Sequence, residues 1–244
     1  HLQRVLDLPV YIGMRHWHPY IKDTVAQMAA LGVARAVVIC LAPHYSRMSI
    51  GAYRQRLDEA LAAVDSDMAI DFVDSWHLQP EYLAGLTARV RQTSTRFTEP
   101  QRVKIVFTAH SLPAAIIDQG DPYDAQVRAT AAAVAERLGL PADRWLLAYQ
   151  SAGRRGERWL GPSIEEVVLG QAQEDARDLL IAPVGFVMDH VEVLYDLDIE
   201  LQQVAAGADA HVERTPMLND SPELVNALAS IVQSQLAEQA ELHG

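Results

Sequence analysis

The chain has 244 residues, of which 50% are apolar, and a formal net charge of −12, as is typical of a soluble globular protein of one or two domains. Its Lys and Arg residues are scattered, which argues against a nucleic-acid partner, because phosphate binding draws on clustered basic residues. No apolar run approaches the ~18 residues of a membrane span, and the first residues lack a secretory signal, so we expect a cytoplasmic protein. A single cysteine, Cys40, excludes an internal disulfide and a cysteine-ligated iron–sulfur cluster, because a cluster needs several thiolates.

Strands and helices are predicted to alternate in the first part of the chain. Residues 8–14 predict a short strand, because a β-branched and apolar run ends at a polar cluster followed by Pro19. The run RAVVICLAP at 35–43 is typical of a strand buried on both faces of a parallel sheet. Because little sequence precedes this run to flank it, we expect the first sheet to be incomplete. The other predicted elements here are a strand at 69–74 and helices at 19–31, 52–64 and 81–96.

The same alternation restarts after residues 98–102, a polar stretch with Pro100 that is the best candidate for a linker. Strands are predicted at 103–108, 145–150, 179–183 and 211–214, and helices at 124–138, 164–178 and from 221 to about 242. Residues 151–163 hold three glycines and Pro162, which predicts an irregular loop. Repeated βα units of this length predict an α/β fold whose parallel sheets carry helices on both faces, in two lobes with a cleft between them.

Residues 182–200, APVGFVMDHVEVLYDLDIE, place acids in an unusual row. If a helix begins at Asp189, one apolar stripe is formed by Leu194, Leu197, Leu201 and Val204. A separate row at four-residue spacing is formed by Glu192, Asp196 and Glu200. Such acids repel by a few tenths of a kcal/mol per pair, and no Lys or Arg lies between residues 189 and 203, so the row predicts a bound cation. The alternative is a solvated acidic helix face, but ligands of α/β proteins collect at junctions such as this one.

His110 lies in FTAHSLP, directly after a predicted strand and before Pro113. Its side chain would emerge at the carboxyl edge of the sheet, where sites form. A neutral imidazole can ligate a divalent metal or accept protons near neutral pH. A purely structural histidine is the alternative.

Several separated motifs resemble the ferrochelatase family, whose members insert ferrous iron into a porphyrin. They are GMRHWHP at 13–19, LAPHYS at 41–46, FTAHSLP at 107–113, WLGP at 159–162 and PVGFVMDHVEVLYDLDIE at 183–200. The resemblance implies two similar Rossmann-like lobes with parallel sheets flanked by helices. It places a first lobe at 1–100, with a returning helix at 221–244, and a second lobe at 101–220. The first lobe would be incomplete, because the family usually carries a further strand, helices and a porphyrin-contacting loop before the position of Pro9.

The function that the resemblance implies is insertion of Fe²⁺ into protoporphyrin IX or coproporphyrin III in haem biosynthesis, with the macrocycle between the lobes. The implied catalytic residues are His110 and Glu192. The implied metal-handling residues are His110, Glu192, Asp196 and Glu200. The implied substrate-binding residues are His44, Tyr45, Ser46, Trp159 and His190. Iron is then a substrate, no organic cofactor is needed, the partners are porphyrin and ferrous iron, and we expect a monomer.

Two other functions stay open on the residues alone. One is a porphyrin- or metal-binding scaffold without turnover, and the other is a tetrapyrrole chelatase that loads cobalt or nickel. The LAPHYS segment is equally compatible with a loop that caps a helix. Beside Trp159, the side chains of Arg154, Arg155 and Arg158 suit the propionates of a macrocycle or an ordinary surface loop. No P-loop, GxGxxG, HExxH or GxSxG motif occurs.

Overall fold

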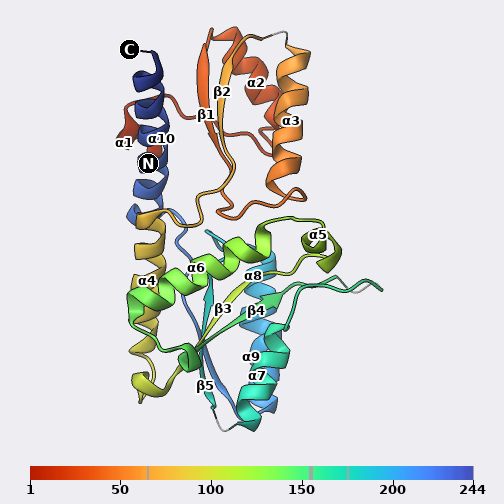
Figure 1. Cartoon of the computed structure of the whole chain (residues 1–244), viewed down its shortest axis with the longest axis vertical. Coiled ribbons are helices and arrows are strands. Elements are labelled where there is room, and N and C mark those ends of the chain that lie inside the picture. Colours follow the sequence, from red (N-terminus) through yellow and green to blue (C-terminus); the bar gives the residue numbers. More distant parts are fainter. Residues whose placement is uncertain (65, 154–155, 175, 244) are drawn as a thin grey trace. The chain divides into compact units, whose positions relative to one another are not determined.

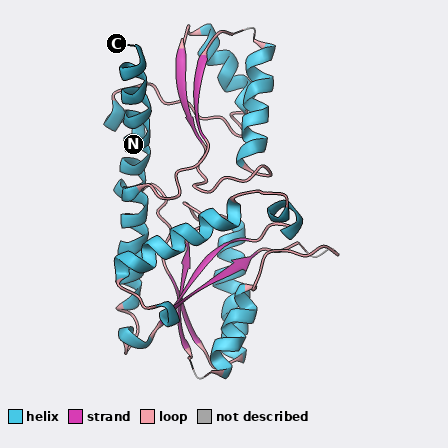
Figure 2. Cartoon of the chain, in the orientation of Figure 1, coloured by secondary structure: helices cyan, strands magenta, loops and turns pink. Residues whose placement is uncertain are grey.

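The computed structural model describes residues 1–64, 66–153, 156–174 and 176–243 (Figure 1). Their contacts group them into two compact units, His1–Trp76 with Val225–Gly244, and His77–Leu224. Each unit combines parallel strands with helices, which confirms the predicted α/β class (Figure 2). The predicted lobe boundaries, 1–100 with 221–244 and 101–220, stay a prediction. Among the described residues, no helix has the length and the apolar character needed to cross a bilayer.

The first unit pairs two parallel strands and covers them with helices. Its elements are α1 (Leu2–Leu6), α2 (Ile21–Ala30), β1 (Arg35–Ile39), α3 (Ile50–Ala63), β2 (Ala69–Val73) and most of α10 (Pro222–His243). Val25 of α2 packs with Leu57 and Ala60 of α3 in its core. All five residues of β1 are only half-buried, so the prediction of a strand buried on both faces is wrong. The reason is that β1 has one neighbour, β2, among the described strands.

Residues 8–14 do not form the predicted strand. The segment makes one isolated bridge, in which the Met14 N–H donates to the Pro19 carbonyl at 2.8 Å and Ile21 N–H donates to the Met14 carbonyl at 3.2 Å. No described strand lies beside it to form a ladder, and a strand without a partner is not stable in water. Its apolar side chains stay in contact with solvent, and Ile12 is 63% exposed.

The second unit is built on a four-stranded parallel sheet. Its strands are β3 (Lys104–His110), β4 (Trp145–Gln150), β5 (Asp178–Pro183) and β6 (His211–Arg214), in the order β4-β3-β5-β6. Its helices include α4 (Pro80–Ser94), α5 (Ala114–Asp118), α6 (Tyr123–Leu138) and α7 (Ile164–Gln173), with short 3₁₀ turns at η1 (Pro100–Arg102) and η2 (Ala142–Arg144). The five central residues of β3 are fully buried, as expected for a strand covered on both faces.

The strand order reverses at β3, because β4 and β5 lie on opposite sides of it. In open α/β sheets, ligands bind outside the carboxyl ends of the strands at such a switch point. The loops that follow β3 and β5 therefore meet at the position where a site is expected.

The acidic helix is continuous but not uniformly α-helical. It runs through α8 (Val191–Tyr195), a π-helical segment η3 (Asp196–Glu200) and α9 (Leu201–Gly207). Of the predicted apolar stripe, Leu197 and Leu201 are buried, whereas Leu194 is 42% exposed and Val204 is half-buried. The buried row consists instead of Val193, Leu197, Leu201 and Ala205. In an α-helix, residues four apart are rotated by ~40° about the helix axis. The wider π-turn compensates for this rotation, so the buried row keeps facing the sheet.

Candidate active site

His110 ends β3 at the switch point and is held by contacts at its backbone and its ring. Its carbonyl accepts a hydrogen bond from the Tyr123 hydroxyl at 3.0 Å. Its Nδ1 lies 2.5 Å from the Ser111 carbonyl oxygen. Because a carbonyl oxygen only accepts, this contact assigns the proton of the neutral ring to Nδ1 and leaves the lone pair on Nε2.

Glu192 faces this lone pair. Its Oε2 lies 3.6 Å from His110 Nε2, with side-chain exposures of 56% for Glu192 and 30% for His110. With a neutral ring, both facing atoms are hydrogen-bond acceptors. Two acceptors that face one another at this distance suit a proton or a cation between them.

The turn that brings Glu192 to His110 depends on a close approach of β5 to β3. After β5, the N–H groups of Val184 and Gly185 donate to the Thr108 carbonyl at 2.9 and 3.1 Å. A Cβ at position 185 would lie 2.6 Å from the Cβ of Ala109, so only glycine fits there. The GF pair of the motif thus sets the path of the chain into α8.

His190 begins α8 as its N-cap. Its Nδ1 accepts from the Val193 N–H at 3.4 Å, and its ring packs against Phe186 with centroids 4.7 Å apart. Burial lowers the pKa of His190, against the smaller opposing effect of Glu192. The lowered pKa favours the neutral ring that can accept this capping hydrogen bond. The predicted contact of His190 with substrate stays a prediction.

Glu192, Asp196 and Glu200 follow one another along the helix, and none of them forms an ion pair with a Lys or Arg of the described residues. The Asp196 carboxylate accepts a hydrogen bond from the Ser151 hydroxyl, at the end of β4. Ser151 itself has a left-handed backbone, with φ of 59°, which is uncommon outside glycine and is concentrated at functional sites.

The four residues predicted to handle metal are not gathered into one cage. Within the described ranges, no group of three or more His, Cys, Asp and Glu side chains is arranged to hold a metal ion. His110 and Glu192 form a pair, and Asp196 and Glu200 continue along the helix away from it. Two protein ligands leave most of a coordination sphere to water or substrate, which suits the passage of an ion better than its storage.

The WLGP loop is tied to the segment that follows His110. Leu160 N–H donates to the Leu112 carbonyl at 2.9 Å, and the Ser111 hydroxyl donates to the Leu160 carbonyl at 2.8 Å. The ring of Trp159 packs so closely on Gly153 that a Cβ there would lie 2.3 Å from it. Trp159 is half-buried, and its predicted contact with substrate stays a prediction.

Arg158 anchors this loop to α5. Arg158 pairs with Asp118 of α5 at 2.9 Å. Arg154 and Arg155 lie outside the described residues.

His44, Tyr45 and Ser46 belong to the first unit. His44 and Ser46 are buried, and Tyr45 is half-buried. The Ser46 carbonyl accepts from the N–H groups of Ser49 and Gly51, each at 3.1 Å. These contacts lie at the start of α3, and the predicted contact of His44, Tyr45 and Ser46 with substrate stays a prediction.

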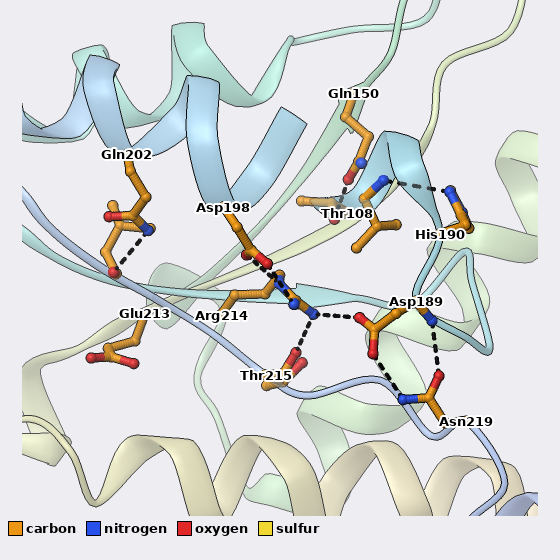
Figure 3. Close-up of polar contacts among 12 residues, drawn as sticks. Thr108, Gln150, Asp189, His190, Asp198, Gln202, Glu213, Arg214, Thr215 and Asn219 are labelled. Atoms are coloured by element: carbon orange, nitrogen blue, oxygen red, sulfur yellow. Dashed lines mark hydrogen bonds and ion pairs between the residues drawn. The ribbon is translucent and has the colours of Figure 1, made fainter. Parts of the chain in front are cut away.

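Two polar residues that the sequence analysis did not single out hold the acidic helix in place (Figure 3). Arg214, at the end of β6, binds Asp198 of η3 through Nε at 2.6 Å and Nη2 at 2.8 Å. Asn219 exchanges two hydrogen bonds with Asp189, at 2.8 and 2.9 Å. Both partners lie 16 or more residues away in the chain, so no local pattern could have revealed either contact.

The chain is similar to known proteins in its sequence and in its fold. A family model described as Ferrochelatase matches residues 1–236. The chain is 40% identical to a ferrochelatase of Deinococcus radiodurans, over 96% of this chain and 74% of that protein. It is 38% identical to a coproporphyrin III ferrochelatase of Geobacillus thermodenitrificans, over 99% of this chain and 77% of that protein. The structure of SirB from Bacillus subtilis with Fe³⁺ matches 98% of this chain and 87% of that one with a TM-score of 0.71 at 14% identity, which shows a shared fold.

Proposed function

The chain belongs to the ferrochelatase family and inserts Fe²⁺ into a porphyrin in haem biosynthesis, and we propose that His110 and Glu192 carry this reaction. The supporting observation is the 3.6 Å approach of His110 Nε2 and Glu192 Oε2 at the switch point of the sheet. Iron insertion releases two protons from the pyrrole nitrogens. The facing atoms are the two proton acceptors that this step needs.

His110 takes one pyrrole proton at Nε2, since Nδ1 is engaged with the Ser111 carbonyl. The Glu192 carboxylate takes the other proton, so both pyrrole protons have an acceptor. One Fe²⁺ replaces two H⁺, so the exchange conserves charge and leaves the oxidation state of iron unchanged. No organic cofactor is required for such an exchange.

Asp196 and Glu200 act before this step. Asp196 lies about 6 Å beyond Glu192 along the helix at a ~1.5 Å rise per residue, and Glu200 lies further on, at the end of η3. Both are too far from Glu192 to contact the same pyrrole nitrogens. Their carboxylate oxygens bind hydrated divalent ions without strong selectivity. We therefore assign them to the delivery of iron.

Apolar side chains beside Glu192 suit the macrocycle. Val191 is 81% exposed and Tyr195 is 49% exposed. Tyr195 lies three residues after Glu192 and so on the same helix face. Exposed apolar groups around a carboxylate fit a flat apolar ring whose polar nitrogens are at its centre.

An absorption assay tests this function. Under anaerobic conditions, the parent protein with Fe²⁺ should convert the free-base spectrum of protoporphyrin IX or coproporphyrin III into a metalloporphyrin spectrum, and comparing the two porphyrins identifies the substrate. Porphyrin binding by the parent without conversion would indicate the scaffold instead. Conversion with Co²⁺ or Ni²⁺ but not with Fe²⁺ would indicate a different chelatase.

Glu192→Gln should bind porphyrin and slow insertion by at least ~10²-fold, because it removes both the charge and a proton acceptor. Glu165→Gln is the matched control, since Glu165 is also an acid in the first turn of a helix, α7, and should keep the parent rate. Full activity in Glu192→Gln would remove Glu192 from the reaction centre.

We also propose that the chain acts as a cytoplasmic monomer. Light scattering at assay concentration tests the oligomeric state.

A further inference from the structure

Arg214 makes the most extensive polar contacts around the acidic helix. Its guanidinium binds both oxygens of Asp198, at 2.6 and 2.8 Å, in a bidentate arrangement. Its Nη1 lies 3.4 Å from Asp189 Oδ1 and donates to the Thr215 carbonyl at 3.0 Å. The side chain is only 13% exposed. One planar group thus connects β6, the π-helical segment η3 and the loop before α8 (Figure 3).

Asn219 completes the attachment of that loop. Its side chain accepts from the Asp189 N–H at 2.9 Å and donates to Asp189 Oδ2 at 2.8 Å. Its own N–H donates to the Val187 carbonyl at 2.8 Å. Asp189 is therefore held through its backbone and both carboxylate oxygens, immediately before the turn that carries Glu192.

The contacts divide the acids of this segment into two sets. Arg214 pairs with Asp189 and Asp198. The remaining acids, which share one row, are Glu192, Asp196 and Glu200. The arginine thus offsets charge beside the row and leaves the row itself without a Lys or Arg partner among the described residues. Its two anchors lie on either side of Glu192 in the chain, so they oppose both rotation and sliding of the helix.

We infer that Arg214 is a positioning residue for iron insertion. Through Asp198 and Asp189 it holds the helix that carries Glu192, Asp196 and Glu200 in its position relative to His110. This inference rests on the proposed function. Arg214 acts through the helix, and no contact of Arg214 with iron or porphyrin is required. Small displacements of catalytic groups are costly, since a shift of ~1 Å can reduce a rate by ~10²-fold.

The test compares Arg214→Met, Arg214→Lys and the control Arg96→Met. Arg96 pairs with Glu213, the neighbour of Arg214 on β6, at 2.9 Å. For each variant, the rate is measured against iron at saturating porphyrin and against porphyrin at saturating iron. Amide hydrogen exchange of the peptide spanning 187–205 is measured on the same samples without substrate.

Arg214→Met should raise the iron concentration for half-maximal rate by about tenfold, the size expected for one charged hydrogen bond, and leave the porphyrin dependence unchanged. It should also speed exchange in the 187–205 peptide, while Arg96→Met changes neither quantity. Arg214→Lys keeps the charge but cannot bind both oxygens of Asp198 at once as arginine does. It should therefore reverse less than half of the change in iron dependence that Arg214→Met causes. An iron dependence within twofold of the parent, or full recovery by lysine, would overturn the inference.

A substitute variant and the hydrogen-exchange measurement distinguish the remaining outcomes. If Arg214→Met does not fold, Asp198→Asn serves instead, because it keeps the side-chain shape and weakens the same pair. If the parent inserts no iron, the proposed function fails, and hydrogen exchange still reports whether Arg214 holds the helix. Faster exchange with an unchanged iron dependence would reduce Arg214 to a structural role and overturn its link to the reaction.

Discussion

The atoms around His110 determine which of its ring nitrogens can accept a proton. The Ser111 carbonyl engages Nδ1, and the Tyr123 hydroxyl binds the backbone carbonyl of His110. The ring therefore presents Nε2 toward Glu192. In the proposed reaction, Nε2 is therefore the ring nitrogen that would accept the proton, because Nδ1 is already engaged.

Replacing His110 with alanine should abolish iron insertion and preserve the fold. The backbone bonds of His110 do not need its side chain, so the melting temperature should stay within about 2 °C of the parent. The insertion rate should fall at least ~10²-fold, the usual contribution of a general base. His211→Ala is the control, since His211 is an exposed histidine on β6. A His110→Ala protein with most of the parent activity would exclude His110 as a catalytic residue.

The residues of the site differed in how far the sequence could reveal them. His110 and Glu192 were predicted to face one another because each lies after a predicted strand and because their motifs resemble the ferrochelatase family. The structure places them 3.6 Å apart, and their catalytic roles stay a prediction. Ser151 and Arg214 could not be predicted, because their partners Asp196 and Asp198 lie far away in the chain. Contacts of this kind depend on the order of the strands, which a local pattern does not contain.

Among the elements, the acidic helix departs most clearly from its prediction. An α-helical period placed Leu194 in the core, whereas Leu194 is 42% exposed and Val193 is fully buried. The π-turn at η3 explains the difference, because it keeps residues four apart aligned over three steps. The same alignment holds the acids Glu192, Asp196 and Glu200 in one row beside the buried one.

The paired strands of the first unit give a pH-dependent prediction. Across β1 and β2, Arg35 binds both oxygens of Asp71, at 2.6 and 2.9 Å. The hydrogen bond from Arg35 lowers the pKa of Asp71, despite the opposing effect of burial. A carboxyl whose pKa is lower in the folded state stabilises the protein above its unfolded pKa of ~3.9. That stabilisation is lost as the pH falls through the folded pKa.

Asp71→Asn should therefore lower the free energy of unfolding at pH 7, and the difference from the parent should shrink as the pH falls below about 3.9 and through the lower folded pKa. Urea unfolding at a series of pH values measures this. Asp74→Asn is the control, because Asp74 is 58% exposed in its pair with Arg54, and exposed pairs contribute little. A difference between Asp71→Asn and the parent that is the same at all pH values would contradict the assignment.

At the scale of the whole molecule, the class of fold could be predicted more fully than its arrangement. The alternation of apolar strands such as β3 with amphipathic helices predicted parallel sheets, because such strands need helices covering both faces. The order β4-β3-β5-β6 could not be predicted, although it places the loops after β3 and β5 at the switch point. Residues 8–14 have a strand-like pattern but form no strand, because no described strand lies beside them to pair with.

We propose that the row of Glu192, Asp196 and Glu200 delivers iron to a reaction centre at His110 and Glu192. The dependence of the insertion rate on iron, measured for the double variant Asp196→Asn, Glu200→Gln, tests this delivery. The iron concentration for half-maximal rate should rise and the porphyrin dependence should stay that of the parent. The melting temperature should rise slightly, because repulsion of a few tenths of a kcal/mol per pair is removed. An iron dependence equal to that of the parent would contradict the claim and leave the row as a solvated helix face.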